Sequence, residues 1–507
     1  MSASLSSAYF IFLKIEDLNP SLLSISLGVL LGIGTALLGV LFPALQASRQ
    51  NPIDAILRRP ASADRKGRSQ IALKIGSVAA LIASLFVGLH LATGARYAGY
   101  CALALLLTGV ALSSPWLVGL LAAAFSGVAE LIGIEGQLAF SNLARNPART
   151  GFTAAAIIIG LAMVVNTSAA TTSVRNAMDA WVEKIFAGDL IIAAHNLFTA
   201  GSVSAPLNET FEQDLLKIDG VSTTSAIRYA KITYRGYLIS VLAVDGSLPG
   251  ARTEKDGPDQ VYVSRNFAEL FHIRTGDRIP LQTDPGPVDF AVAGTIDEYN
   301  YNWPRGTVIV DRSLYKKYWD DHLIDQIILH VVPGEGVDAV RKRVISRYGA
   351  RYNLTVFTNR EFRDNFMAII DQQFSLTYAQ LLITVVVVTL AITNALMTSV
   401  VSRRMEIGVF RAVGASQLQS QKIVVLESAL LGLAGIVYGT ALGSLVTAVF
   451  VRLILPDETG WIVSFRIPLG TMAYTALAAL VISVVGAILP LREIQRQSIV
   501  SLVRYEE

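Results

Sequence analysis

The sequence predicts a membrane protein: an α-helical transmembrane bundle of about seven spans, with a mixed α/β domain inserted outside the bilayer. The chain is 52% hydrophobic and only 16% charged over its 507 residues, whereas soluble globular proteins are about 25% charged. Its mean hydropathy is +0.50. Seven apolar stretches reach the length of about 20 residues that a helix needs to cross the hydrocarbon layer. A long polar stretch between the fourth and the fifth of them carries strand-like patterns, which predict the inserted domain.

The predicted spans lie on either side of residues 175–372. They cover 21–45, 71–93, 98–124, 151–174, 374–402, 421–452 and 467–491. Most of the lysine and arginine in the short connections lies on one face of the bilayer. The other face holds only Lys14, Arg96, Arg452 and Arg466. Because cytoplasmic loops carry the excess of basic residues, the C-terminus is predicted to be cytoplasmic and residues 175–372 to be outside.

Residues 175–372 contain the alternating apolar residues that predict strands. AIRYAKITYRGYLISVLAVDG (226–246) predicts two strands with a turn near Arg235-Gly236. Further strands are predicted at 288–296, 306–311 and 325–332. VDAVRKRVISRYG (337–349) has the apolar spacing of a helix, with Gly349 as its stop. We therefore expect a mixed α/β domain.

The stretch RRMEIGVFRAVGASQ, which begins at Arg403, leaves the fifth span on the predicted cytoplasmic side. It predicts a short amphipathic helix that breaks near Gly414 before the chain returns to the membrane. One interpretation is an interfacial helix whose arginines reach the lipid headgroups. The other is a docking helix for a cytoplasmic partner. The residue pattern alone leaves both interpretations open.

This stretch resembles the signature of the FtsX-like permease family, the membrane subunits of MacB-type ABC transporters. NLARNPARTGFTAAAIIIGLAMVV (142–165) resembles the family's approach to the span before the external domain. VYVSRNFAELFHIRTGDRIPL (261–281) and VDFAVAGTIDEY (288–299) are similar to the MacB-like periplasmic core domain. The resemblance implies that the short helix is a coupling helix seated in a groove of a separate ATPase. The residues implied for it are Arg403, Arg404, Glu406, Ile407, Gly408, Arg411, Ala412, Gly414 and Ala415.

Small residues recur along the predicted sixth span, at Gly432, Gly435, Gly439 and Gly443. Small residues at this spacing let helices approach closely in lipid, either within one chain or between two subunits. Glu427 lies near the cytoplasmic end of the same span. An acid inside a membrane is a functional candidate, but its closeness to the interface also fits a structural pair or a solvated carboxylate.

No motif indicates catalysis, a bound cofactor or a metal site on this chain. The sequence lacks the G-x-x-x-x-G-K-[ST] phosphate loop, so ATP and Mg²⁺ are expected on a partner. The five histidines show no paired metal-ligand spacing. Asp320-Asp321-His322 is expected to be a solvated loop rather than a cation site, and Asp297-Glu298 a turn without an acid–base role. The net charge of +3 does not suggest nucleic-acid binding, and the lone Cys101 gives no disulfide framework.

The resemblance implies a non-catalytic, multi-pass subunit of an ABC transporter in the bacterial inner membrane. A cytoplasmic ATPase dimer would pull on the coupling helix, and spans 151–174 and 374–402 would move the external domain as a stalk. The work done outside would be export or release of a lipoprotein, lipid or peptide. The alternative is a mechanical regulator of an extracytoplasmic cell-wall hydrolase. A third interpretation is a membrane-anchored interaction module without an ATPase.

A repeated ending indicates how the chain is divided. PALQASRQNPIDAILR (43–58) follows the first apolar run, and PLREIQRQSIVSLVR (490–504) follows the last with a similar pattern. In the family, larger members join two permease units, so the chain is expected to be part of such a permease or half of a split subunit. With only one coupling helix, it is expected to pair with a second copy or with a separate permease half.

The expected divisions follow the family's order of parts. They are 1–60, the end of a first unit; 61–134, a joining pair of spans; 135–174, an interfacial helix and the first span of a second unit; 175–372, the periplasmic core domain; and 373–507, the FtsX-like permease domain with the coupling helix.

Overall fold

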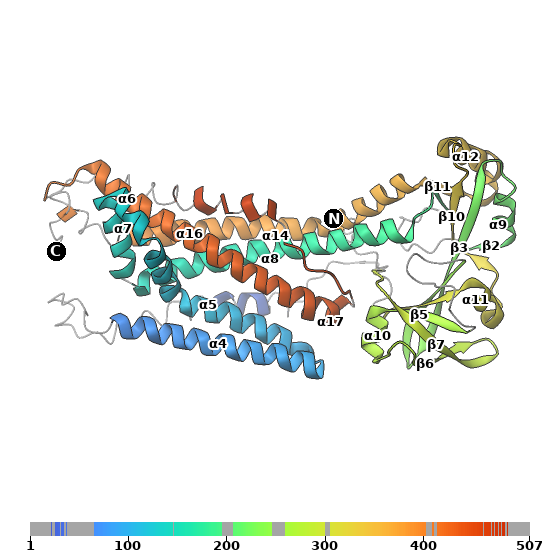
Figure 1. The fold of residues 1–507 in the computed structure, drawn as a ribbon, viewed down its shortest axis with the longest axis horizontal. Coiled ribbons are helices and arrows are strands. Elements are labelled where there is room, and N and C mark those ends of the chain that lie inside the picture. Colours follow the sequence, from blue (N-terminus) through green and yellow to red (C-terminus); the bar gives the residue numbers. More distant parts are fainter. Residues whose placement is uncertain are drawn as a thin grey trace.

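The computed structural model is elongated, with a helical bundle at one end and a sheet domain at the other (Figure 1). It describes residues 65–145, 147–194, 206–245, 259–299, 305–401, 413–459 and 461–467, together with short pieces within 22–37, 408–409 and 469–484. The bundle and the stalk consist of α4 (Arg65–Thr93), α5 (Arg96–Ala124), α6 (Ser126–Ile132), α7 (Ile134–Arg145), α8 (Pro147–Ile185), α14 (Asn359–Val401), α16 (Gln417–Val449), the π-helical turn Phe450–Ile454 and α17 (Leu455–Thr459).

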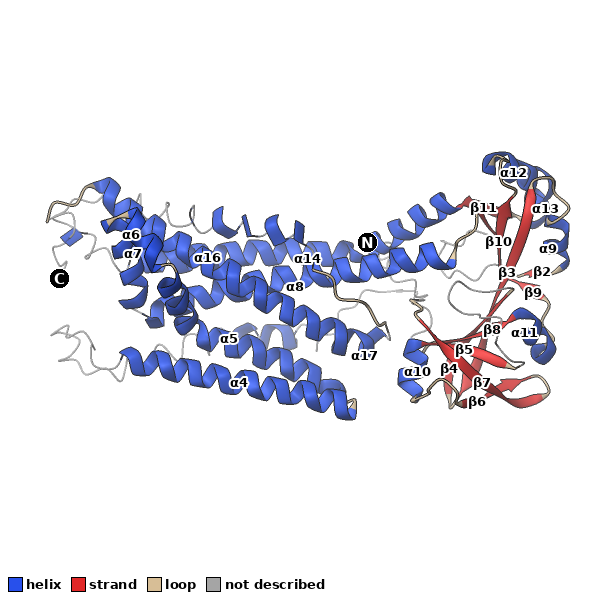
Figure 2. Cartoon of the chain, in the orientation of Figure 1, coloured by secondary structure: helices blue, strands red, loops and turns tan. Residues whose placement is uncertain are grey.

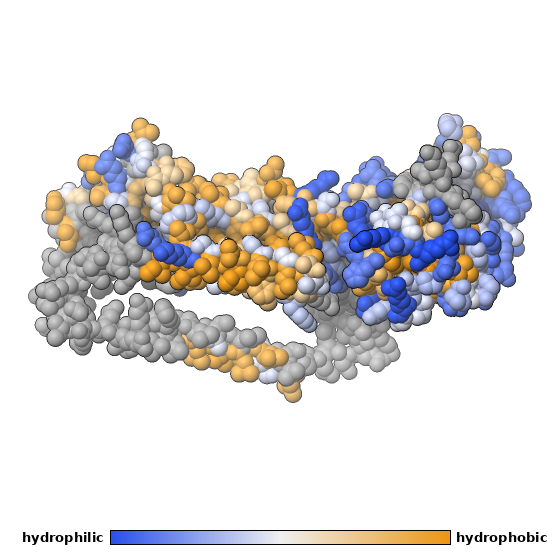
Figure 3. Space-filling model, turned by 60° about the horizontal axis from the view of Figure 1, so that its bottom comes forward, coloured by the Kyte–Doolittle hydropathy of each residue, from blue (hydrophilic) through white to orange (hydrophobic). Residues whose placement is uncertain are grey.

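Four helices among the described residues are long and apolar enough to cross a membrane. They are Leu73–Thr93, Tyr97–Ala124, Thr153–Ile185 and Gln417–Thr459. Asn359–Gln372 and Phe374–Leu390, bent by 43°, make a fifth if they are counted as one span. Figure 3 shows the matching apolar surface over the bundle and a largely hydrophilic surface over the sheet domain. The predicted count of seven is not confirmed, because the stretches 21–45 and 467–491 lie mostly outside the described residues.

Two helices are longer than the thickness of a bilayer. α8 has 39 residues and α14 has 43, which at 1.5 Å per residue is roughly 60 Å each, about twice the hydrocarbon thickness. α8 begins with Pro147 in its first turn, where the missing N–H costs nothing. The predicted boundary at residue 175 therefore falls within a helix, and both helices extend to the sheet domain as a paired stalk (Figure 2).

The sheet domain contains one mixed sheet of nine strands in the order β11-β1-β10-β3-β4-β8-β5-β7-β6. The strands are β1 (Leu190–Ala194), β3 (Val221–Tyr234), β4 (Tyr237–Val244), β5 (Gln260–Ser264), β6 (Arg278–Thr283), β7 (Gly286–Ile296), β8 (Thr307–Asp311), β10 (Gln326–Val331) and β11 (Leu354–Thr358), with a separate pair β2 (Leu207–Asn208) and β9 (Leu323–Ile324). The helices of the domain are α9 (Thr210–Leu215), α10 (Arg265–Phe271), α11 (Arg312–Trp319), α12 (Val337–Val344), the π-helical turn Ile345–Gly349 and α13 (Ala350–Tyr352).

β3 is the longest strand and belongs to two lobes. Its first half pairs with β10, and its second half pairs with β4. The stalk lobe, made of β1, β10, β11, α9 and α12, has its own apolar core around Leu190, Phe211 and Val340. The hairpin lobe, made of β4 to β8, α10 and α11, has another around Val241, Phe267 and Phe290. The sheet domain is therefore two packed lobes that share one strand.

The predicted strands are confirmed, and one predicted stop is wrong. The turn between β3 and β4 is Arg235-Gly236, and both residues have positive φ, 47° and 81°, as in the two-residue hairpin turns that match strand twist. The helix that starts at Val337 does not stop at Gly349. It passes through a π-helical turn and ends at Asn353, whose φ is 48°, because asparagine tolerates the left-handed conformation that closes a helix.

Candidate functional site

The glycines of α16 form the contact with α8. A Cβ at Gly439 would lie 2.9 Å from the Cβ of Leu161. A Cβ at Gly443 would lie 2.7 Å from the Cβ of Val165 and 2.8 Å from the carbonyl oxygen of Ala162. Gly435 meets α8 in the same way, and Gly432 is buried on the same helix. Three of the four predicted glycines therefore serve packing within the chain.

Glu427 is a structural pair rather than a solvated acid. Its Oε1 accepts a hydrogen bond of 2.7 Å from the side-chain amide of Asn142 on α7, and Glu427 is 9% exposed. This buried hydrogen bond joins α7 to α16. α7 is the helix that directly precedes the stalk helix α8.

Most of the predicted coupling helix lies outside the described residues. Arg403, Arg404, Glu406, Ile407, Arg411 and Ala412 belong to that part of the chain. Gly408 is buried, and Gly414 has a φ of 108°, so the predicted break is where the chain turns. Ala415 follows, and Ser416 then starts α16 with a reciprocal capping box to Gln419, which satisfies two orphan N–H groups. The turn into the membrane is therefore well defined.

Two reciprocal ion pairs join α8 to α14 in the stalk. Arg175 of α8 donates to both carboxylate oxygens of Asp371, at 2.8 and 3.2 Å. Arg363 of α14 donates to both oxygens of Asp179, at 2.8 Å each. Each pair lowers the energy of the charged forms: the hydrogen bond from Arg363 lowers the pKa of Asp179. The pairs fix the register of the two helices.

An aromatic joint connects the stalk to the sheet domain and to the segment after α17. Trp181 of α8 lies 6.0 Å from Phe366 of α14 and 6.3 Å from Tyr299, which follows β7. The Tyr299 ring lies 6.2 Å from Trp461, and its hydroxyl donates to the Ile462 carbonyl at 2.8 Å. Because buried aromatic pairs each add about 0.5–1.5 kcal/mol beyond their area, this joint holds together α8, α14, the residues after β7 and the segment after α17.

Glu298, one residue before this joint, is not the turn acid that the sequence predicts. It is 9% exposed, and burial raises the pKa of its carboxyl to about 7. Its neighbour Asp297 is half exposed and pairs with Arg265 at 2.8 Å. Glu298 is therefore a buried acid, while Asp297 pairs at the surface.

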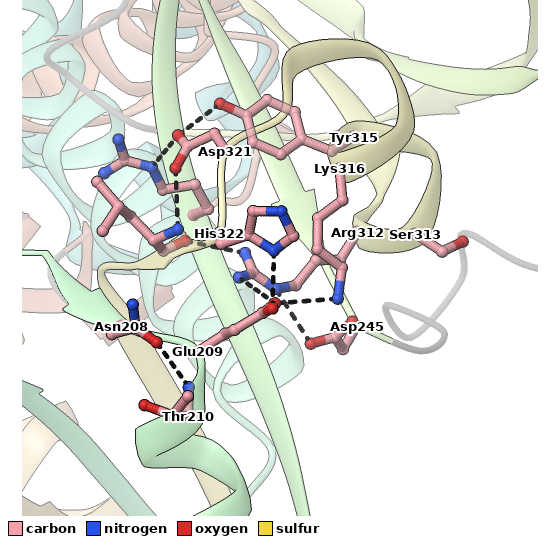
Figure 4. A network of polar contacts seen from close by, with 12 residues as sticks. Asn208, Glu209, Thr210, Asp245, Arg312, Ser313, Tyr315, Lys316, Asp321 and His322 are labelled. Carbon is pink, nitrogen blue, oxygen red and sulfur yellow. Dashed lines mark hydrogen bonds and ion pairs between the residues drawn. The ribbon is translucent and has the colours of Figure 1, made fainter.

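In the expected solvated loop at residues 320–322, the side chains of Asp320 and His322 are 91% and 50% exposed, whereas Asp321 is 19% exposed and belongs to a polar network between the lobes (Figure 4). Asp321 accepts from Arg228 of β3 at 2.8 Å and from the Tyr315 hydroxyl at 3.0 Å. Arg228 also bonds Asp325 at 3.1 Å. Burial alone would raise the pKa of Asp321, but the Leu323 N–H and the Arg228 and Tyr315 hydrogen bonds outweigh it and lower the pKa.

The other half of the network centres on Glu209. It accepts from Lys316 of α11 at 3.1 Å and lies 2.7 Å from Nδ1 of His322. The 1% exposed guanidinium of Arg312 lies 3.5 Å from Asp245 and 3.9 Å from Glu209. Because Glu209 belongs to the stalk lobe and α11 to the hairpin lobe, these contacts clamp the lobes together. Within the described residues, no group of three or more metal-ligating side chains could hold an ion.

The sequence does not reveal the stalk pairs, the aromatic joint or the lobe clamp. Arg175, Asp179 and Trp181 stand four and two residues apart, which places charge and an aromatic ring just beyond a span. That spacing is a signal of an interface position. The partners cannot be found from the sequence, because Asp371 and Arg363 lie 196 and 184 residues away.

Comparisons with known proteins agree with this arrangement. A model of the MacB-like periplasmic core domain matches residues 150–347, and a model of the FtsX-like permease C-terminal domain matches residues 379–499. An uncharacterized ABC transporter permease protein of Mycobacterium tuberculosis (strain ATCC 25618 / H37Rv) is 25% identical over 533 residues. The match takes in 100% of this chain and 61% of that protein, so the chain spans less than two thirds of its relative's length.

Two solved structures also resemble parts of the chain. The periplasmic region of MacB from Actinobacillus actinomycetemcomitans gives a TM-score of 0.28 at 10% identity, covering 36% of this chain and 95% of that one. The extracellular domain of the noncanonic ABC-type transporter YknZ from Gram-positive bacteria gives 0.25 at 15% identity, covering 34% and 99%. Scores this low carry no weight, so the assignment rests on the two domain matches, which together span more than half of the chain. The chain therefore contains an FtsX-like permease C-terminal domain and, before it, a MacB-like periplasmic core domain.

Proposed function

We propose that the chain is the membrane subunit of an ABC transporter and carries movement from a separate cytoplasmic ATPase to its periplasmic core domain. The work done by that domain is export or release of a lipoprotein, lipid or peptide. ATP and Mg²⁺ bind on the ATPase, and this chain contributes no catalytic residue. The protein spans a bacterial inner membrane. Its C-terminus and its coupling helix lie on the cytoplasmic side, and the sheet domain lies on the opposite side.

The observation that carries the proposal is the way the stalk enters the sheet. α8 leads into β1, and β11 leads into α14. β1 and β11 are neighbours in the sheet and pair over five residues, from Leu190 opposite Thr358 to Ala194 opposite Leu354. A relative movement of the two spans is thus applied to two hydrogen-bonded strands, with only residues 186–189 between α8 and β1.

The ends of the stalk also pack against the face of the sheet. One apolar cluster joins the stalk to the sheet. The stalk contributes Val182 of α8, Phe186 just after α8 and Phe362 of α14, and the sheet contributes Ile191 and Leu242. The two ion pairs add little rigidity of their own, since they are about two-fifths exposed and surface pairs are worth about 0–1 kcal/mol. The stiffness of the connection therefore comes from strand pairing and buried aromatic contact.

The cytoplasmic end of the path is the proposed coupling helix. α16 starts immediately after it, at a turn fixed by Gly414 and the Ser416 capping box. α16 packs along α8 through its glycines. A push on residues 403–415 would reach α8, and through α8 the sheet domain.

The test is charge reversal in the coupling helix of the membrane complex co-expressed with its ATPase. Glu406→Lys with Arg411→Glu should reduce both the amount of ATPase that copurifies and its stimulated activity. The matched control is Arg360→Glu, at a 92% exposed side chain on the opposite end of the molecule, and it should leave recruitment unchanged. Unaltered recruitment and activity in the double reversal would reject the coupling-helix assignment.

The same preparation separates the two kinds of external work. Retention of a lipoprotein or lipid by the sheet domain supports export or release. Retention of a cell-wall amidase or endopeptidase would instead support mechanical regulation of a hydrolase, which uses the same path through the stalk. A second permease copy or a separate permease half should also copurify, because one chain supplies one coupling helix.

A further inference from the structure

α17 marks the end of the membrane bundle that faces the sheet domain. Asp457 of α17 lies 3.8 Å from Nδ1 of His90, which is in the last turn of α4. Glu458 accepts a hydrogen bond of 3.0 Å from Tyr100, which is in the second turn of α5. Three span candidates therefore end at the same level. This level sets where the hydrocarbon layer gives way to headgroups on the side of the sheet domain.

α10 of the hairpin lobe lies beside this level. Figures 1 and 2 show α10 on the side of the lobe that faces the bundle, next to α17. Burial raises the pKa of the Glu269 carboxyl in α10, and the negative charge of Asp457 adds to that effect while Arg265 opposes it. The carboxylates of Glu269 and Asp457 are thus close enough for their charges to interact. The hairpin lobe consequently reaches down to the edge of the bundle.

The described surface next to Glu269 combines exposed apolar side chains with arginines. Leu270 of α10 is 43% exposed, and Tyr237 and Leu238, which follow the β3–β4 turn, are 44% and 55% exposed. The Arg305 guanidinium lies 4.4 Å from the centre of the Tyr237 ring. Arg235, in the turn itself, donates to the Phe271 carbonyl at 3.4 Å. These contacts make the turn, α10 and Arg305 one continuous surface.

The composition of this surface differs from that of an ordinary solvated face. Arg265 nearby is already paired with Asp297, whereas neither Arg235 nor Arg305 forms an ion pair with any carboxylate in the described part of the chain. The headgroup region of a bilayer favours side chains with an apolar part that faces the lipid tails and a polar end that faces water. Tyrosine and arginine beside leucine meet this requirement. Arginine also pairs with phosphate through two parallel hydrogen bonds.

We propose that Arg235, Tyr237, Leu238, Leu270 and Arg305 form a membrane-contact surface, by which the hairpin lobe rests on phospholipid headgroups of the leaflet nearest the sheet domain. Leu270 and Leu238 enter the interface, and the two arginines bind lipid phosphates. The lobe is then held both by the stalk and by the bilayer surface. Because this contact does not depend on an ATPase, it can be tested separately from the proposed transport function.

The experiment uses the full chain in nanodiscs, in a Cys101→Ser background, with one introduced cysteine carrying an NBD fluorophore. Leu270→Cys reports on the surface. Ser346→Cys, exposed in the turn after α12 at the far end of the stalk lobe, is the matched control. Phospholipids with a nitroxide on the headgroup should quench the label at residue 270 severalfold more than the label at residue 346. Equal quenching at the two positions would overturn the proposal.

Two further measurements identify the occupant. Nanodiscs should contain one chain each. The alternative is that a second copy of the chain covers this surface. In that case the fluorescence of the label at residue 270 would be blue-shifted only in discs that hold two chains, and the headgroup nitroxide would not quench it. This result would reject the proposed contact with the bilayer. In discs with anionic lipid, Arg235→Gln and Arg305→Gln should each lower the ratio of docked to undocked lobe by about fivefold. An unchanged ratio in the double variant would remove the arginines from the proposal.

Discussion

The contact between α8 and α16 gives the sharpest prediction, because one methyl group should have opposite effects at two glycines. In Gly443→Ala the new Cβ would lie 2.7 Å from the Cβ of Val165 and 2.8 Å from the carbonyl oxygen of Ala162. Carbon atoms in contact are normally about 3.5–4.0 Å apart. The shortfall is on the order of 1 Å, and the carbonyl cannot move without moving α8.

The magnitude follows from two opposing contributions. Overpacking of a well-packed contact costs about 1–3 kcal/mol. Replacing glycine by alanine inside a helix returns about 1 kcal/mol through helix propensity. Gly443→Ala should therefore lower the free energy of unfolding by up to about 2 kcal/mol. Gly439→Ala, whose Cβ would stand 2.9 Å from Leu161 and 3.0 Å from the Ile158 oxygen, should cost somewhat less.

Gly88→Ala in α4 is the control. A Cβ at Gly88 would have nothing within 4 Å, so only the gain in helix propensity remains and the variant should be as stable as the parent or more so. The assay is thermal unfolding of the full chain in detergent, followed by fluorescence-detected size-exclusion chromatography. If Gly443→Ala melts at or above the temperature of Gly88→Ala, the close approach of the two helices is refuted.

Three further predictions concern single side chains. Burial raises the pKa of the Glu298 carboxyl in the native state to about 7, from 4.5. The native state therefore binds more protons than the unfolded state between these pH values, and the free energy of unfolding should fall by up to about 3 kcal/mol as the pH rises through this window. Glu298→Gln should flatten this slope in pH-dependent thermal unfolding. Asn142→Ala removes a hydrogen bond to the Glu427 side chain and should cost about 0.5–1.5 kcal/mol, an effect that should shrink in a Glu427→Gln background if the two side chains are coupled. Tyr299→Phe removes the hydrogen bond to the Ile462 carbonyl and should cost about 1 kcal/mol, with faster hydrogen exchange confined to residues 461–466; exchange that is unchanged there would contradict the joint.

Local patterns in the sequence were sufficient for the elements of the fold. The Arg235-Gly236 turn was predictable because two neighbouring positions must adopt positive φ between alternating strands. The stop at Gly349 was wrong because a glycine inside a helix costs only about 1 kcal/mol, and Tyr352, in the turn after Gly349, packs on Phe211 with ring centres 4.8 Å apart. Packing of the next turn outweighs that cost.

The long-range contacts could not be predicted, for a physical reason. Asp321 and Glu298 have ordinary neighbours in the sequence, and only the fold places Arg228 beside the first and buries the second. A charged residue in a turn-like stretch is therefore assigned to solvent by default. The coupling-helix residues Arg403, Arg404, Glu406 and Arg411 remain a prediction, since they lie outside the described residues.

The neighbouring position of β1 and β11 also constrains how the protein is made. β1 leaves the ribosome some 160 residues before β11, so for most of synthesis one edge of β1 has no partner. An open strand edge invites pairing with other chains. Contacts this distant in sequence form slowly, and this one can form only after β11 has been synthesised. Closure of the β1–β11 pair thus covers the edge of β1 only late in the synthesis of the domain, and it makes β11 the edge strand of the sheet.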